Sequence, residues 1–214
     1  MGIVEFTGSA LILHAEFVLY GSAASETLAK EMADDVAFHW NEPGAQVFFR
    51  SVITPVQFNI KGVYAPQLVE EEVLSNTDAL RNFFRIEPFA NGNISFVDGV
   101  NSNTGYFKLD NLLNRSTTAA HEFGHTIGLD HPANLDIRGR GVPGIMYPRG
   151  TIVDPEFQYD PAARPLAPGG TMDPHKRKVL EEDVQALRFD KLQFTGSLAT
   201  IGAFSSVWHE AHRP

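Results

Sequence analysis

Three histidines and one glutamate are gathered near the middle of the chain. His121, Glu122, His125, Gly128 and His131 form the pattern H-E-x-x-H-x-x-G-x-x-H. Four residues are close to one helical turn, so His121 and His125 project from the same face of a helix. Glycine adopts a positive φ without penalty, so Gly128 can end this helix and turn the chain until His131 joins the other two. The pattern therefore requires a helix followed at once by a tight turn.

Three imidazoles held in this way suit a tetrahedral Zn²⁺ ion whose fourth position is left for water. Glu122 neighbours His121 on the same turn and can reach a zinc-bound water, which suits a general base. The pattern thus predicts one catalytic zinc ion held by His121, His125 and His131, with Glu122 as the catalytic residue. Two other interpretations stay open: surface histidines before an ordinary glycine cap, and a zinc site without catalysis.

Residues 121–131 read HEFGHTIGLDH and resemble the zinc motif of the metzincin metallopeptidases, most closely of their matrixin-like branch. Metzincins also have a methionine-containing turn beneath the metal, and residues 144–148, GIMYP, resemble its matrixin version. The resemblance implies a zinc-dependent endopeptidase that hydrolyses peptide bonds through a zinc-bound water activated by Glu122. It gives Met146 the role of a packing residue under the metal.

The chain departs from matrixins after its third histidine. Matrixins usually place serine there, whereas this chain has Pro132, and residues 132–145 make a longer connection to Met146. Metzincins with a tyrosine zinc ligand carry it two residues after the methionine, where this chain has Pro148. We therefore expect no tyrosine ligand, and a matrixin-like protein rather than a matrixin.

The resemblance implies an α+β fold. We expect a twisted, mixed and mostly parallel sheet with an antiparallel edge strand, packed helices including the active-site helix, and a smaller C-terminal subdomain across a cleft. The length of 214 residues fits a single catalytic domain over residues 1–214. Residues 1–128 would form the N-terminal subdomain with the sheet and the zinc helix, and 129–214 the C-terminal one with residues 144–148 and a last helix.

Hydrophobic patterning predicts the elements around the motif. Strands are indicated by apolar or alternating runs, and helices by apolar residues that recur every three or four positions. Residues 69–85 give no clear pattern, and 149–174 are predicted to be a long loop that forms the far wall of the cleft. The predicted strands are 11–20, 46–53 and 56–64, the last two separated by Thr54-Pro55, and the predicted helices are 25–40 and 180–187.

A hairpin is predicted over residues 93–109, where two apolar strands flank Asp98-Gly99 and a loop rich in Asn and Gly. In metzincins an antiparallel edge strand binds extended substrate by strand addition, and residues 94–97 are our candidate for it. An edge strand without a binding role stays open. The expected substrate-binding residues are Ile94, Ser95, Phe96, Val97, Tyr147 and Pro148.

Net charge limits the partners. A formal charge of −9 argues against nucleic acid and anionic membranes, which both need a basic face. We expect a protein or peptide substrate and a monomer. The chain has no cysteine, so His, Asp, Glu or backbone oxygen must hold any metal. Calcium is possible but not indicated, because Asp154, Asp160 and Asp173 show no fixed loop pattern.

Residues 9–24 resemble a signal peptide only superficially, because Glu5 precedes them and His14 and Glu16 interrupt the apolar run. We expect a secreted or exported bacterial enzyme without a visible signal peptide in this chain, while the cytoplasm stays open. Two alternatives for its function remain. One is the peptidase domain of a bacterial toxin or effector within a larger secreted protein, and the other is a zinc-stabilised, non-catalytic binding module.

The two ends of the chain share a short repeat. Residues 194–197 repeat residues 6–9 as Phe-Thr-Gly-Ser. We hypothesise that the termini lie side by side as strands, with chance repetition as the alternative. His14 is expected to be a core histidine with a hydrogen-bond partner. His39 is expected at the surface or at a helix end, and His175 at an exposed position. His209 and His212 are expected to be disordered or at the surface.

Overall fold

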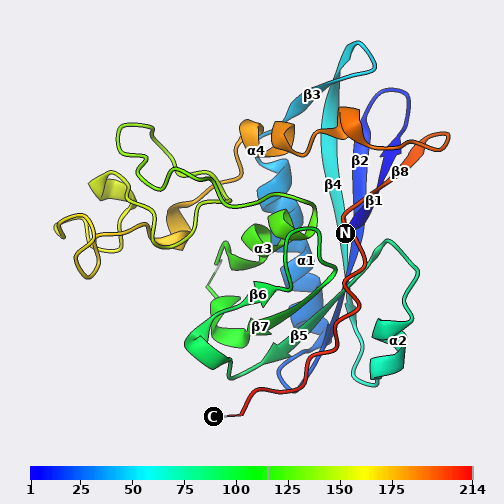
Figure 1. The fold of residues 1–214 in the computed structure, drawn as a ribbon, viewed down its shortest axis with the longest axis horizontal. Helices are drawn as coiled ribbons and strands as arrows, with labels where there is room; N and C mark the ends of the chain where they lie inside the picture. Colours follow the sequence, from blue (N-terminus) through cyan, green and yellow to red (C-terminus); the bar gives the residue numbers. More distant parts are fainter. Residues whose placement is uncertain (115, 214) are drawn as a thin grey trace.

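The computed structural model describes residues 1–114 and 116–213, so Arg115 and Pro214 of the predicted 1–214 domain lie outside the described residues. Figure 1 shows a twisted sheet with α1 (Glu26–Asn41) and α3 (Thr118–Thr126) beside it, and a loop-rich region that projects to one side. The predicted mixed α+β class is confirmed. No helix of the described chain is long and apolar enough to cross a membrane.

All eight strands that the structure describes belong to one sheet. Its strand order is β3-β4-β2-β5-β7-β6, with β1 paired to β2 and β8 paired to β1. The pairings of β2 with β4 and β5, and of β5 with β7, are parallel, whereas the pairings at the margins are antiparallel. The strands are β1 (Gly2–Phe6), β2 (Leu11–Tyr20), β3 (Gln46–Phe49), β4 (Val52–Tyr64), β5 (Arg81–Glu87), β6 (Phe96–Val97), β7 (Thr104–Lys108) and β8 (Leu198–Ile201).

Aromatic side chains join the sheet to both long helices. Phe17 of β2 packs edge-on against Phe84 and against Phe123 of α3, with ring centroids 5.2 and 5.3 Å apart. Trp40 of α1 lies 6.0 Å from Phe123, and its indole N–H donates to the Ala120 carbonyl at 3.1 Å. These rings are buried, and burial of each contributes about 1.5–3 kcal/mol. The core therefore fixes α3, and with it the histidine motif, against the sheet.

The predicted break at Thr54-Pro55 is wrong, because β4 runs through it without interruption. The chain reverses earlier, at Arg50 and Ser51, whose φ angles are 47° and 71°. Proline fixes φ near −65°, which an extended strand tolerates, and it is found on strands near a sheet margin. β4 lies next to the margin, because on its outer side it pairs only with the short β3. The two residues of this left-handed turn are neither glycine nor proline, so the sequence showed no turn signal there.

Residues 69–85, which gave no clear pattern, form α2 (Glu70–Leu74) and the start of β5. β5 lies between β2 and β7, and both Phe83 and Phe84 are buried. Its charged residues are accommodated by each other, since Arg85 and Glu87 form an ion pair at 2.7 Å. A strand with paired charges on one face does not show the continuous apolar run that marks a buried parallel strand.

The region after His131 is mostly irregular and is built around a small core of Ile137, Val153 and Met172. Two isolated bridges, Asp136 to Ile152 and Gln158 to Met172, tie it together. The long loop predicted at 149–174 contains a short 3-10 turn, Pro155–Phe157, and a second, Pro174–Lys176, begins at its last residue. The predicted helix at 180–187 is confirmed as α4 (Glu181–Ala186).

The hypothesis that the termini lie side by side is confirmed, because β1 and β8 pair antiparallel. Residues 202–213 then run along the outside of β5 and β7, as the red segment of Figure 1 shows. Residues 198–213 thus return to the sheet rather than staying with the expected C-terminal subdomain.

His209 and His212 of this tail, expected at surface or disordered positions, both lie half-buried against the folded sheet. His209 contacts Asp98 at 2.9 Å, and His212 stacks on Tyr106 with ring centroids 4.0 Å apart. His14 lies on β2, half-buried, and contacts Glu5 at 3.1 Å.

Candidate metal centre and active-site cavity

The structure brings the three predicted histidines together. His121 and His125 lie on the same face of α3, one turn apart. The helix ends at Thr126, and Gly128 then turns the chain with a φ of 104°, while its N–H donates to the His125 carbonyl at 3.0 Å. His131 returns so that its Nε2 lies 3.1 Å from Nε2 of His121 and 3.1 Å from Nε2 of His125.

Backbone carbonyls fix which nitrogen of each helix histidine carries hydrogen. Nδ1 of His121 lies 2.7 Å from the Ile145 carbonyl, and Nδ1 of His125 lies 2.7 Å from the Leu129 carbonyl. A carbonyl oxygen only accepts, so each Nδ1 donates and each Nε2 keeps its lone pair. A single hydrogen on His131 could serve only one of these two lone pairs, whereas a cation between the rings serves all three nitrogens.

The three nitrogens fit the donor set of a metal ion. Tetrahedral Zn²⁺ with bonds of about 2.0–2.1 Å holds its ligand atoms about 3.3–3.4 Å apart, close to the observed 3.1 Å. All three ligand atoms lie within 4.8 Å of one another. The structure thus places the three histidines close enough to bind a metal ion, as predicted, and imidazole nitrogen suits zinc among other transition metals.

Burial keeps the histidines neutral, as metal ligation requires. It lowers the pKa of His121 to about 2, with Arg177 as the second cause. Burial also lowers the pKa of His125 and of His131 below the ordinary value of 6.5. Protons therefore do not compete with a cation for these nitrogens at neutral pH.

Glu122 is buried beside the histidines, 8% exposed. Its Oε2 accepts a hydrogen bond from the Val97 N–H at 3.1 Å. Burial raises the pKa of Glu122 from 4.5 to about 7, although the Val97 N–H and then Arg177 act in the opposite direction. A carboxyl group with a pKa near 7 can both take up and release a proton at neutral pH.

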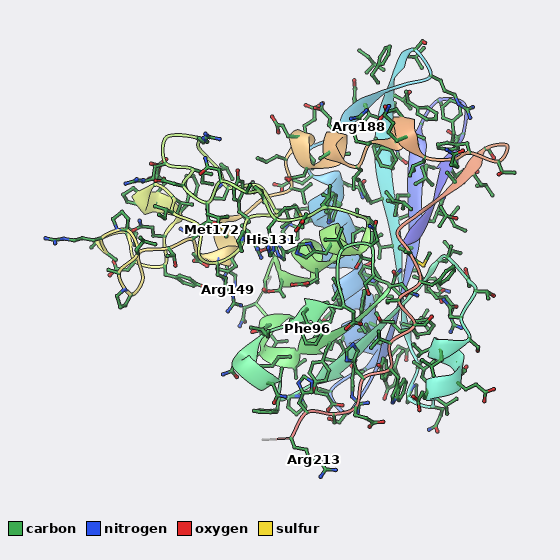
Figure 2. The ribbon with its side chains drawn as sticks, viewed as in Figure 1. Phe96, His131, Arg149, Met172, Arg188 and Arg213 are labelled. Carbon is green, nitrogen blue, oxygen red and sulfur yellow. The ribbon has the colours of Figure 1, made fainter. Side chains whose placement is uncertain are left out.

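A cavity of about 430 Å³ opens over the metal centre. Glu122 and the three histidines line it. So do five of the six predicted substrate-binding residues, namely Ile94, Ser95, Phe96, Val97 and Pro148. Figure 2 shows Phe96, His131 and Arg149 around this opening. Tyr147, the sixth, packs instead against the small core that contains Ile137 and Met172.

β6 forms the edge of the sheet and pairs antiparallel with β7, as predicted, but it is shorter than residues 94–97. The Ser95 hydroxyl accepts the Lys108 N–H at 3.1 Å, so a side chain replaces the next backbone bond and regular pairing ends. The Asp98 N–H donates to the Thr104 carbonyl of β7. Successive residues of a strand direct their backbone groups to opposite sides, so the preceding residue, Val97, directs its backbone away from β7. Its N–H and carbonyl are therefore on the open side of the edge.

Met146 lies directly against α3 and is 3% exposed. A β-carbon built on Gly124 would come within 2.2 Å of the Met146 sulfur. Ile145, which precedes it, accepts the hydrogen bond from His121. The turn at residues 144–148 therefore packs beneath the helix and orients one histidine ring.

Arg177 also belongs to the site, although it was not among the predicted site residues. Its side chain is buried, donates from Nη1 to the Tyr147 carbonyl at 2.8 Å, and reaches Thr117 Oγ1 from Nη2 at 3.0 Å. Nη1 also lies 3.0 Å from Nδ1 of His121, but that nitrogen already donates to Ile145, so this contact is no hydrogen bond. Burial lowers the pKa of Arg177 to about 10, and the guanidinium stays charged at neutral pH.

One signal in the sequence could have identified Arg177. The chain from Arg177 to Val179 is extended, and burial alternates along it, with Arg177 and Val179 buried and Lys178 exposed. Alternation with a valine places Arg177 on the inner face.

No protein-family model matches this chain, and no curated protein matches it.

Proposed function

We propose that this protein is a zinc-dependent endopeptidase of the metzincin type, matrixin-like in its motif. One observation carries the proposal: three convergent Nε2 atoms and a buried carboxyl group with a pKa near 7 share one cavity with the free edge of a sheet. His121, His125 and His131 would hold the ion. Bound there, zinc would supply Lewis acidity to a water molecule and to the carbonyl of the bond that is cut.

Glu122 is the group that moves the proton. Its carboxylate takes a proton from the attacking water and gives it to the leaving amine. The same group must be ionised before attack and protonated after it, and its surroundings favour neither form alone: burial favours the protonated carboxyl, whereas the Val97 N–H and Arg177 favour the carboxylate. The Val97 N–H holds Oε2, which fixes the orientation of the carboxylate.

β6 supports binding of an extended peptide. Val97 directs its backbone to the cavity rather than to β7. Because its N–H is engaged by Glu122, its carbonyl is the main-chain group with which an added peptide strand can pair. Strand addition binds a peptide through its main-chain N–H and C=O groups, so it does not depend on the peptide's side chains. A protein or peptide substrate, a monomeric state and export from the cell belong to the proposal, as the motif resemblance and the net charge suggest.

Metal analysis and digestion of a broad peptide library, with and without chelator, test the function. We expect about one zinc per chain and chelator-sensitive cleavage. The Glu122→Ala variant should fold and bind zinc but lose at least about a hundredfold in kcat/KM, since a general base contributes roughly 10²–10⁴-fold. Peptidase activity retained in this variant would refute the assignment.

The same experiments separate the alternatives. A chain that binds zinc but leaves every library peptide intact is a binding module. A toxin or effector peptidase should slow bacterial growth when the wild type, but not Glu122→Ala, is produced in the periplasm or cytoplasm. Equal growth in all cases argues against that role.

A further inference from the structure

Two arginines line the cavity over the metal centre, Arg149 and Arg177, in a chain whose formal charge is −9. Among the described residues neither of them forms an ion pair, whereas Arg81, Arg85, Arg138 and Arg188 each have a carboxylate partner. Unpaired guanidinium groups in a cavity attract anions strongly, because the protein walls weaken screening by solvent.

The two arginines are placed for different tasks. Arg177 is buried in the cavity wall and donates from Nε, Nη1 and Nη2 to Thr117 and Tyr147, so its main contribution to the cavity is positive potential. Arg149 is exposed and follows Pro148 at the opening, where Figure 2 shows it between Phe96 and His131. Its guanidinium makes no hydrogen bond to any other described residue, so the whole fork of donors is available to a ligand.

The cavity also contains two acidic groups, and both are already engaged by backbone N–H groups. Glu122 is engaged by the Val97 N–H, and Asp130 accepts the His131 N–H at 2.7 Å. Two carboxylates thus face two guanidinium groups, and a bound metal ion adds two further positive charges. The occupied cavity therefore has a positive balance.

We propose that the cavity selects peptides with an aspartate or glutamate side chain next to the bond that is cut, and that Arg149 is the residue that determines this specificity. This inference rests on the proposed peptidase function. A planar guanidinium binds a carboxylate through two parallel hydrogen bonds, which an amide of the same shape cannot accept as well. Arg177 strengthens the preference through its charge, without touching the substrate.

Peptide twins test the proposal. A peptide cut in the library digestion is made with Asp or Glu beside the cleaved bond, and its twin carries Asn or Gln. We expect kcat/KM to be about tenfold higher for the acidic peptide, since a charge-assisted hydrogen bond contributes at least that much. In Arg149→Gln this ratio should fall towards one, whereas in the control Arg140→Gln, an exposed arginine of the loop at 138–141, it should stay near ten.

Equal kcat/KM for the twins in wild type, or an unchanged ratio in Arg149→Gln, overturns the proposal. If wild type cuts no peptide, the peptidase function has failed, and the specificity is judged by binding. Fluorescein-labelled peptide pairs that differ only by Asp against Asn, or Glu against Gln, at one position are then titrated onto zinc-loaded Glu122→Ala protein, and binding is followed by anisotropy. An acidic peptide bound about tenfold more tightly, with the difference removed by Arg149→Gln, supports the inference, and equal Kd values overturn it.

Discussion

Replacing Gly124 with alanine tests how closely Met146 is packed beneath α3. On this helix Gly124 directly precedes His125, one of the three candidate metal ligands. A β-carbon here would lie 2.2 Å from the sulfur of Met146 and 3.3 Å from Cζ2 of Trp40. Both side chains are buried, 3% and 1% exposed, so neither has free space into which it can move.

Two effects of opposite sign decide the result. Alanine in a helix interior is favoured over glycine by about 1 kcal/mol. Overpacking of a filled core costs about 1–3 kcal/mol. In the wild-type background the two combine to a loss of up to about 2 kcal/mol. In a Met146→Ala background the overlap disappears, and Gly124→Ala should stabilise by about 1 kcal/mol. The coupling free energy between the two sites is then about 1–3 kcal/mol.

Urea unfolding of the four metal-free proteins measures this cycle, since the absence of metal removes any contribution from ligand binding. Gly150→Ala is the matched control: a β-carbon there meets nothing within 4 Å, so we expect a change within about 0.5 kcal/mol. If Gly124→Ala stabilises the protein equally with and without Met146, the methionine does not pack under this helix and the reasoning fails.

Three further changes should have measurable effects. Burial raises the pKa of Glu122 to about 7, so this group stabilises the metal-free fold below about pH 4.5 and loses up to about 3 kcal/mol of that stabilisation as pH rises through 7. Urea unfolding of wild type and of Glu122→Gln across this pH range measures the loss as the difference between their stability curves. Zinc at about a hundred times its Kd should add about 2.7 kcal/mol to stability, which raises Tm by roughly 5–10 °C; chelator reverses the shift and His131→Ala should abolish it. Deleting residues 204–213 removes the stacking of Trp208 on Tyr20, at 4.8 Å, and the contact of His209 with Asp98, so Tm should fall; an unchanged Tm would show that the tail does not support the sheet.

The elements that the sequence predicted well are those whose signal is local. The apolar repeat of α1 and the apolar run of β2 depend on each residue's own chemistry, and both elements formed within a residue or so of the expected bounds. β5 could not be found in this way. Its burial depends on β2 and β7 on either side and on an ion pair between Arg85 and Glu87, which a search for apolar runs counts as evidence against a buried strand.

The metal site was predictable for a related reason. A helical turn brings His121 and His125 together, and a single glycine turn adds His131, so the whole ligand set is encoded in residues 121–131. The hydrogen bond from Val97 to Glu122 was not predictable. It joins the sheet edge to the helix across a span of chain whose path only the folded core defines.

Arg177 is a buried charged residue within a run of polar residues, and its position two residues before Val179 is the signal that could have predicted its burial. It stands in the run His175-Lys176-Arg177-Lys178, where all four side chains look solvated. His175, Lys176 and Lys178 are exposed, but Arg177 alternates with Lys178 and is buried like Val179. Burying an unpaired guanidinium costs several kcal/mol, so a fold tolerates it only where hydrogen bonds or nearby ligands offset that cost. A charged residue in phase with buried apolar neighbours therefore points to a site, and here the cavity it lines is the one over the metal centre.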